Sequence, residues 1–473
     1  MEPIFTNNAI VFGLLMIVLA AIFTTSSSQQ QGWQKFYRIV PPLLLCYFLP
    51  AFLNWPFGLI AYEWFDHSLL SFASEQGIRI EAGMSFNEIK KLLEGHGIGA
   101  EVYGAFTRKS SLYHVASRYL LPASLILLCI SIDLKGLIRL GGKSIAMFLA
   151  ATTGIILGGP IAILLVSFIA PDLVGGADAD QIWRGMSTIA GSWIGGGANQ
   201  AAMKEIYNVS DSIFGAMLVV DIVVANIWMG FLLYGASIAP RLDKWLNADA
   251  SAIEALKHKV EDYQASIAKI PNMADEFKIL AVAFGGTALA HWGADWIAPA
   301  LESWNASTIG GAYPHGKLVD WGLSSFMSGF FWLIVIATTV GFAFSFTPLK
   351  KLEGAGASRI GSVFIYILVV TIGMQMNLQE VLQNLNVFAI GIVWMLIHVS
   401  VLLLVAKLIR APFFFVAVGS QANVGGAASA PIVASAFSPA LAPVGALMAV
   451  LGYALGTYGA IICAELMRLV SAL

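Results

Sequence analysis

A series of apolar runs, each long enough to cross a membrane, sets the strongest limit on how this chain folds. Crossing roughly 30 Å of hydrocarbon takes about 20 helical residues. Ten runs meet that length with some latitude, and they lie near residues 8–26, 37–55, 117–133, 144–170, 212–239, 278–299, 321–347, 358–376, 387–408 and 441–467. Because unpaired backbone groups are costly in lipid, these runs predict transmembrane helices and an all-α polytopic membrane protein.

Composition supports this fold class and excludes others. Of 473 residues, 58% are hydrophobic and 11% charged, less than half the charged share of a soluble domain. The net charge of −2 lacks the basic excess that nucleic-acid binding requires. Cys46, Cys129 and Cys463 lie in apolar runs without CxxC or histidine-rich spacing, so we expect them to pack rather than to hold a transition metal or form disulfides. No Lys or Arg precedes the first run, which is therefore interpreted as a retained span rather than a signal peptide.

Two further segments are apolar but interrupted by small and polar residues. They lie near 185–206 and 411–433, and the first contains GSWIGGGANQ at 191–200. Glycine allows the chain to turn and backbones to approach closely. Irregular backbone at membrane depth is tolerated only where protein or a water-filled cavity surrounds it. One such run alone would favour simple close helix packing.

The distribution of charged residues tests whether the interrupted segments cross. If both turn back and the N-terminus lies outside, the positive-inside rule holds from end to end. The cytoplasmic loops then contain Lys35, Arg38, Lys135, Arg139, Lys143, Lys350, Lys351, Arg359, Lys407 and Arg410. A full crossing of the first segment would place the basic loops of the two halves in opposite compartments. Both segments are therefore predicted to be re-entrant hairpins.

Two segments outside the spans carry mixed charge. Residues 56–116 form an outer insertion with a short helix, where Ser85 and Glu88 have capping-box spacing and Gly95 a stop position. We expect this insertion to lie on the membrane rather than to form a domain. Residues 240–277 contain apolar positions every three or four residues, which predict a cytoplasmic amphipathic linker helix. A partner-binding coiled coil is the alternative for this linker.

The interrupted segments belong to an internal repeat. SIDLKGLIRL around Asp133 corresponds to QMNLQEVLQN around Asn377, and FGAMLVVDIVVANIWMG corresponds to VGALMAVLGYALGTYGA. Between them, the aligned pairs are Gly191 with Gly419, Ser192 with Ser420, Gly196 with Gly425 and Gly197 with Gly426. Five crossings per half is an odd number, so the second half must be inverted. The predicted division is a first repeat at 1–239, the linker at 240–277 and a second repeat at 278–473.

An inverted repeat with interrupted helices is typical of secondary transporters, which bind solute and ions where the breaks meet near the midplane. Asp221 lies deep in an apolar run, where an ionisable group is expensive and therefore a functional candidate. It could carry a proton or bind sodium, or it could be a carboxyl hydrogen-bonded to a neighbouring helix. Asn226, five residues on, is a second ion-coupling candidate. His398 is interpreted as a hydrogen-bonded structural histidine. Lys204 and Arg184 flank the first break, but no Lys or Arg lies deep in a span, which disfavours a citrate-like substrate.

GSWIGGGANQ and GSQANVGGAASAP, together with NLQEVL after VVTIGM, resemble the YjcL-like family of uncharacterised bacterial and plastid membrane proteins over about residues 8–470. More distantly, the pattern is similar to the glutamate:sodium symporters and the 2-hydroxycarboxylate transporters. This resemblance implies a scaffold domain from the first two spans of each half and a mobile transport domain that contains both hairpins. It also implies an elevator-like motion, a homodimer and a location in the bacterial inner membrane.

The resemblance further implies that the hairpin tips bind solute and sodium. Carried over residue by residue, the binding positions are Ser192, Gly195, Gly196, Gly197, Ala198, Asn199, Gln200, Ser420, Gln421, Asn423, Gly425 and Gly426. Gln421 and Asn423 stand where relatives have a plain glycine turn, so the identity of the solute does not transfer.

The sequence therefore predicts a secondary transporter for a small polar or anionic solute, such as an amino acid, short peptide or carboxylate. Sodium or protons would drive it, and no other cofactor is expected. A cation:proton antiporter centred on Asp221 is the alternative, although the usual adjacent acidic pair is absent. An intramembrane enzyme is a remote third reading, because HExxH and GxSxG motifs are absent.

Overall fold

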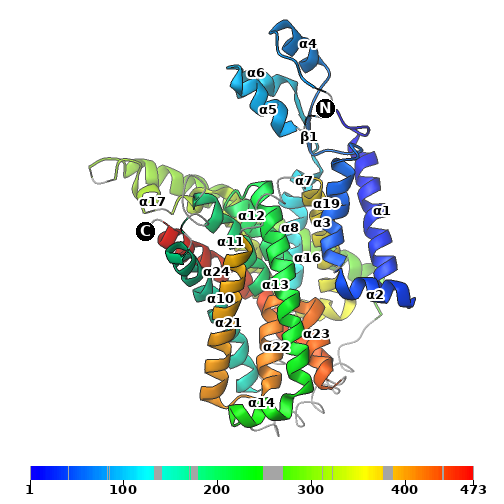
Figure 1. Ribbon diagram of the computed structural model, residues 1–473, viewed down its shortest axis with the longest axis vertical. Helices are drawn as coiled ribbons and strands as arrows, with labels where there is room; N and C mark the ends of the chain where they lie inside the picture. Colours follow the sequence, from blue (N-terminus) through cyan, green and yellow to red (C-terminus); the bar gives the residue numbers. More distant parts are fainter. Residues whose placement is uncertain are drawn as a thin grey trace. The chain divides into compact units, whose positions relative to one another are not determined.

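The structure is a computed structural model that describes most of the chain (Figure 1). The described residues are 2–40, 42–81, 84, 86–130, 132, 141–169, 171, 179–248, 270–311, 313–321, 323–375, 387–438 and 441–471. The predicted linker helix around 253–269 lies outside them, as do Asp133, Asn377 and Ser85.

Long apolar helices dominate the fold. Among the described residues, six helical segments are long and apolar enough to cross a membrane, or up to eight if each of two bent pairs forms one span. The six are α1 (Asn8–Ser26), α7 to α8 (Leu112–Ile130), α10 (Gly142–Ile169), α13 (Asp211–Ser237), α21 (Phe388–Ile409) and α24 (Ala442–Ser471). The bent pairs are α2 (Gln31–Ile39) with α3 (Pro42–Asn54), and α18 (Gly329–Phe344) with η5 (Pro348–Ala355). The all-α, multi-pass fold class is thus confirmed.

The two remaining predicted spans also coincide with helices. These are α16 (Met273–Ser307) and α19 (Ala357–Gly373). Asn272 and Asp275 form a capping box at the start of α16. Neither belongs to the helices that meet the length and hydropathy criteria for a span. The ten-span count therefore stays a prediction. The short helices between spans are α14 (Ala239–Leu246), α17 (Lys317–Asp320) and η4 (Ser324–Met327).

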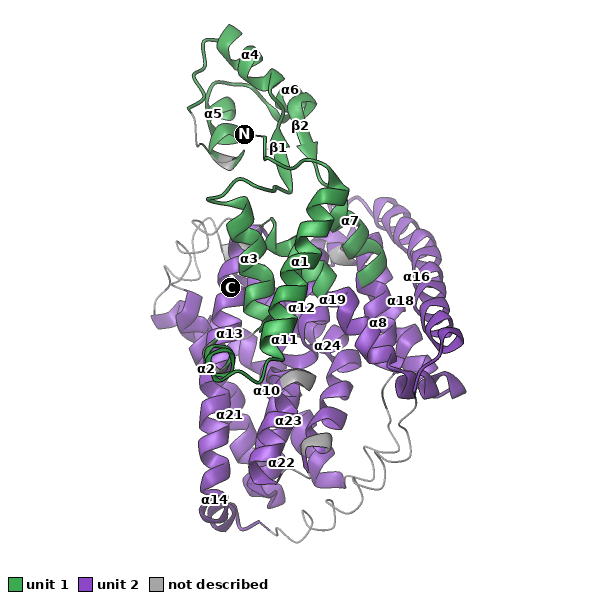
Figure 2. Ribbon diagram, turned by 90° about the vertical axis from the view of Figure 1, so that its right-hand side faces the viewer, with its two compact units in different colours: residues 1–120, 366–380 green, residues 121–365, 381–473 purple. Residues whose placement is uncertain are grey.

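The chain divides into two compact units, which Figure 2 colours separately. Unit 1 contains residues 1–120 and 366–380, and unit 2 contains 121–365 and 381–473. This division by contacts differs from the predicted division by repeats, which remains a prediction.

The insertion at 56–116 has a buried hydrophobic cluster of its own, while the expectation that it lies on the membrane stays a prediction. Strands β1 (Glu63–Phe65) and β2 (Thr107–Lys109) pair antiparallel, with Trp64 opposite Arg108. The helices are α4 (Ser68–Glu75), α5 (Phe86–Gly95), α6 (Ala100–Tyr103) and η1 (Gly104–Phe106), after which α7 (Leu112–Val115) and η2 (Ala116–Leu120) lead into α8 (Leu121–Ile130). Phe65, Leu69, Leu93 and Tyr103 are buried together. Helix α5 ends at the predicted Gly95. We call residues 56–116 the insertion subdomain.

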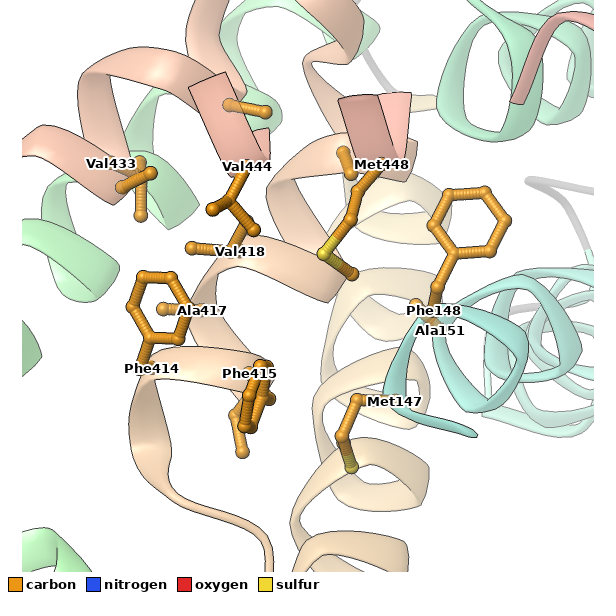
Figure 3. Close-up of a cluster of buried hydrophobic side chains, with 14 of the residues drawn as sticks. Met147, Phe148, Ala151, Phe414, Phe415, Ala417, Val418, Val433, Val444 and Met448 are labelled. Atoms are coloured by element: carbon orange, nitrogen blue, oxygen red, sulfur yellow. The ribbon is translucent and has the colours of Figure 1, made fainter. Parts of the chain in front are cut away.

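Unit 2 contains both interrupted segments as helix pairs. They are α11 (Ala179–Gly195) with α12 (Gly197–Ile206), and α22 (Phe413–Val424) with α23 (Gly426–Phe437). A buried apolar cluster joins the second pair to α10 and α24, with Phe148, Phe415, Val433 and Met448 among its members (Figure 3). Cys46, Cys129 and Cys463 are buried and unpaired, which confirms their expected role in packing.

Candidate functional site

The first interrupted segment folds back on itself as a hairpin. Its two helices meet at Gly196, whose φ of 76° is accessible to glycine at little cost. At the open end, the Arg184 guanidinium donates to the Tyr207 carbonyl at 3.0 Å, and the Trp183 and Tyr207 rings lie edge to face. The start of α11 and the end of α12 therefore lie together. We call this pair hairpin 1.

The second interrupted segment has the same form. Its turn lies at Gly425 and Gly426, where Gly426 has a φ of 58°. At the open end, the rings of Phe413 and Phe414 in α22 lie 6.2 and 5.2 Å from Phe437 in α23. We call this pair hairpin 2. The glycines at the turns of hairpins 1 and 2 belong to the glycine pairs that the sequence alignment matches.

The two hairpins approach from opposite ends of α13. Near the start of α13, Asp211 pairs with Lys204 of hairpin 1 at 3.0 Å. Near its end, Gly235 lies against the Phe413 ring of hairpin 2. Asp243, in the following helix α14, accepts the Phe413 backbone N–H at 2.7 Å. The 24 residues between Asp211 and Gly235 span about 36 Å at a helical rise of 1.5 Å per residue.

The tips of the hairpins meet beside the middle of α24. A methyl group on Gly452 would overlap the Ile194 carbonyl oxygen of hairpin 1 and would lie 3.7 Å from the Ala422 carbonyl oxygen of hairpin 2. One turn further along α24, Gly456 lies against the backbone of Gly195. Glycines on α24 thus let both tips approach the same helix closely.

Asn199 joins hairpin 1 to α24. Its amide nitrogen donates to the Gly195 carbonyl at 3.0 Å, within the hairpin, and to the Tyr453 carbonyl at 3.1 Å. The Thr457 hydroxyl donates to the Asn199 Oδ1 at 2.5 Å. Both donors and the acceptor oxygen of this fully buried amide are therefore used within the protein.

Asn423 joins hairpin 2 to α10 in the same way. Its amide nitrogen donates to the Gly419 carbonyl at 3.0 Å and to the Phe148 carbonyl at 3.2 Å. The Thr152 hydroxyl donates to the Asn423 Oδ1 at 2.8 Å. In both cases the threonine lies four residues after the carbonyl that the asparagine contacts. We call each such group an asparagine clasp. Asn199 follows its glycine turn and Asn423 precedes its own, so they are not repeat partners.

Asp221 of α13 contacts hairpin 1. Its two carboxylate oxygens accept hydrogen bonds from the Trp193 indole at 2.7 Å and from the Gln200 amide at 2.9 Å, and Ser192 also interacts with it. The side chain is buried, and its hydrogen-bond partners among the described residues are all uncharged. Neutral donors stabilise a carboxylate by hydrogen bonding but supply no positive charge to balance its negative charge.

Ser420 of hairpin 2 lies in a second polar cluster. Its hydroxyl accepts the Trp228 indole N–H of α13 at 2.8 Å and lies 2.8 Å from the His398 Nε2 of α21. The His398 Nδ1 lies 3.1 Å from the Ala151 carbonyl of α10. The hydrogen bonding expected for His398 is thus confirmed, and the ring lies against a predicted binding residue.

The remaining predicted residues divide into two groups. The turn glycines Gly196, Gly197, Gly425 and Gly426 are partly exposed, whereas Ser192, Asn199, Gln200, Ser420, Gln421 and Asn423 are buried. Asn226 does not join them, because its side chain is exposed and its amide donates to the Ile222 carbonyl of its own helix. Lys204 and Arg184, which flank the first turn in sequence, lie at the open end of hairpin 1 rather than at its tip.

Several residues of this site were missed by sequence reasoning. Thr152 and Thr457 complete the asparagine clasps, while Trp193 and Trp228 bind Asp221 and Ser420. The threonines stand in AATTGIILGG and LGTYGA, where small residues around a hydroxyl were an available sign of close backbone approach. The tryptophans carry no comparable signal, because aromatic residues are common in apolar spans.

Comparison with known proteins identifies relatives that share most of the chain. A family model described as "Protein of unknown function (DUF819)" matches residues 97–470. "Uncharacterized membrane protein YjcL" from Bacillus subtilis (strain 168) is 25% identical over 373 residues, which are 76% of this chain and 85% of that protein. The YjcL-like resemblance drawn from the hairpin motifs is therefore confirmed. The chain belongs to the DUF819 family and is a multi-pass membrane protein.

Proposed function

We propose that the chain is a secondary active transporter that moves a small polar or anionic solute across the bacterial inner membrane. One observation carries this proposal: two glycine-broken hairpins extend from opposite ends of α13 and meet beside α24. Interrupted helices that meet inside an apolar protein supply backbone groups and polar side chains at depth, which is where secondary transporters bind their solutes.

The coupling ion would act through Asp221. A buried carboxylate surrounded by neutral donors gains from a nearby cation, so a sodium ion or a proton would be favoured there. The transport cycle would follow the elevator scheme implied by the resemblance, with α1, α3, α16 and α18 in the scaffold. A homodimer through that scaffold, an outer N-terminus and the absence of enzymatic activity are parts of the same proposal.

Uptake into proteoliposomes tests the proposal. The purified full-length protein is offered labelled amino acids, short peptides and carboxylates, with and without an inward sodium gradient and at two external pH values. We expect accumulation of at least one solute that needs one of the two gradients. A Gly230→Ala variant serves as the control, because a methyl group there meets no atom within 4 Å. Failure of every solute to accumulate would contradict a solute transporter.

A cation:proton antiporter is the second candidate, and the uncompensated carboxylate of Asp221 favours it. In that case no solute would be accumulated, and a sodium gradient alone would drive proton flux in the same proteoliposomes. The two candidates thus give opposite results in one preparation.

A further inference from the structure

Each hairpin contains a buried glutamine whose side-chain oxygen lacks a hydrogen-bond donor among the described residues. These atoms are the Oε1 of Gln200 and the Oε1 of Gln421. The two side chains are 0% and 2% exposed. Gln200 follows its turn at Gly196 by four residues, and Gln421 precedes its turn at Gly425 by four, so each lies one helical turn from a tip.

The other end of each glutamine amide is occupied. The Gln200 amide nitrogen donates to the Asp221 carboxylate at 2.9 Å. An ionised carboxylate only accepts hydrogen bonds, so this contact fixes which way the amide faces and turns Oε1 away from Asp221. The Gln421 amide nitrogen lies 2.7 Å from the Ser429 hydroxyl across the turn of hairpin 2. The Gln200 oxygen is therefore held in place, and both glutamine oxygens remain open to a donor.

Leaving an amide oxygen buried without a donor costs about 1–3 kcal/mol. Native proteins pair nearly all such atoms, and an exception calls for a reason such as a missing ligand. The asparagine clasps on the same hairpins show that other buried amides of this protein have all their hydrogen-bonding groups paired. In the two glutamines, by contrast, the amide nitrogen is hydrogen-bonded and the oxygen is not. Their position beside the hairpin tips points to a ligand that supplies the missing donors.

The charged residues near hairpin 1 indicate which kind of donor group the ligand would supply. Asp221 beside Gln200 has only neutral hydrogen-bond partners, which favours a positively charged group nearby. The basic residues of the hairpin are placed elsewhere: Lys204 pairs with Asp211, and Arg184 holds the Tyr207 carbonyl. A solute with only carboxylates would meet acceptor oxygens and a like charge at this tip.

Resting on the proposed transport function, we propose that Gln200 and Gln421 accept hydrogen bonds from a nitrogen donor of the solute. That donor is an ammonium or amide N–H group, so the solute is an amino acid or a related nitrogen compound rather than a simple carboxylate. Of the solute classes that the sequence leaves open, the two oxygens therefore favour amino acids and peptides over simple carboxylates.

The test compares solutes that differ only at the donor. Purified full-length protein in lipid nanodiscs is heated with L-alanine, L-lactate or propionate, and with L-glutamate, glutarate or citrate, in sodium and in choline buffer. L-Alanyl-L-alanine is added as a peptide. We expect an amino-bearing compound to raise the melting temperature, while the matching compound without nitrogen does not.

Two pairs of variants assign that shift to the oxygens. Gln200→Met removes the oxygen of Gln200, whereas Ser187→Ala removes a hydroxyl of hairpin 1 that donates only within its own helix. Gln421→Met and Ser435→Ala, whose hydroxyl also donates only within its own helix, form the corresponding pair in hairpin 2. The two methionine variants should weaken the apparent affinity roughly tenfold, as loss of one charge-assisted hydrogen bond predicts. The two control variants should change it by less than about threefold.

Three results would overturn the inference. They are equal stabilisation by lactate, propionate or glutarate, stabilisation by sodium alone that Gln200→Met abolishes, and the absence of any shift with the nitrogen compounds. Proteoliposome uptake separates this failure from failure of the proposed function. Accumulation of a nitrogen-free carboxylate would sustain the transporter while refuting this choice of solute.

Discussion

At the scale of single residues, the asparagine clasps explain how polar side chains are accommodated in an apolar interior. Asn199 and Asn423 each use two donors and one acceptor, and a threonine one turn along the neighbouring helix supplies the last partner. The resemblance implies that both asparagines contact the solute. In the structure their amides hold the hairpins to α24 and α10, and the glutamines carry the open acceptors.

Replacing a clasp threonine should destabilise the protein without changing the shape of the side chain. Thr457→Val and Thr152→Val each leave a buried asparagine oxygen without its donor, and we expect a loss of roughly 1 kcal/mol for each. The measurement is thermal unfolding of the purified variants in one detergent. Ser167→Ala, which removes an exposed hydroxyl bonded only to its own helix, should leave the midpoint in place. Equal midpoints for all three variants would show that the clasps contribute nothing.

Asp221→Asn should alter the ion dependence of transport. The amide keeps the size of the side chain but removes its charge, so the response of uptake to sodium or to external pH should flatten. Initial uptake rates across a sodium series and a pH series provide the measurement. An unchanged dependence on both would assign Asp221 a purely structural role.

Sequence reasoning reached the glycines and the deep acid but not their partners. Gly196 and Gly426 stand out because only glycine readily adopts positive φ, and Asp221 stands out because charge is rare at membrane depth. Thr152 and Thr457 act on hairpins distant in sequence, and local pattern carries no information on which helices will be neighbours. Asn226 was grouped with Asp221 by proximity, yet five residues along a helix rotate it to the exposed side.

At the scale of elements, the hairpins were predictable and the insertion subdomain was not. Loop charges required both interrupted segments to turn back, and ring contacts between Phe413, Phe414 and Phe437 show that the second does so. The strands of the insertion are three residues each and pair across a separation of more than forty residues. Elements that short give no periodic signal, so only the helix ending at Gly95 was found in advance.

The close approach of the hairpins to α24 should depend on its glycines. Gly452→Ala places a methyl group into the Ile194 carbonyl oxygen, which forces backbone apart and should lower the unfolding midpoint by several degrees. Gly230→Ala in α13 is the matched control, since the added methyl group meets open space and helix propensity favours alanine. If both variants unfold at the wild-type temperature, the tip does not require this contact.

The insertion subdomain should lose protection in acid through Asp66. The Ser68 hydroxyl, and then Arg108, hold the pKa of this carboxyl below its usual value. Its contribution is therefore present above the unfolded pKa of about 3.9 and is lost as pH falls through the lower folded pKa. Hydrogen exchange of α4, corrected for intrinsic rates, should show protection falling in that range. Asp66→Asn should show weaker protection at pH 7 and no loss of protection in acid. Identical pH profiles for the variant and the wild type would show that Asp66 is not the cause of the acid effect.

At the scale of the whole molecule, α18 and α24 touch through Thr338 and Thr457, whose hydroxyls lie 3.0 Å apart. In the elevator scheme, α18 belongs to the scaffold and α24 moves with the hairpins. This contact would then break in each cycle. The clasps, in contrast, join elements that all belong to the moving part.

A disulfide between positions 338 and 457 should therefore stop transport. In a background without Cys46, Cys129 and Cys463, Thr338→Cys with Thr457→Cys is oxidised in proteoliposomes, and uptake is expected to disappear and to return with reductant. Thr457→Cys alone controls for the weakened clasp. Undiminished uptake after complete cross-linking would contradict relative motion of these two helices.

The clasps also bear on electrical insulation. Because the amides of Asn199 and Asn423 are satisfied by protein groups, the depth at which the hairpins meet needs no bridging water at these positions. A continuous file of water would conduct protons and dissipate the gradient on which the cell depends. The two clasps thus leave no unpaired amide group at Asn199 or Asn423 from which such a file of water could begin.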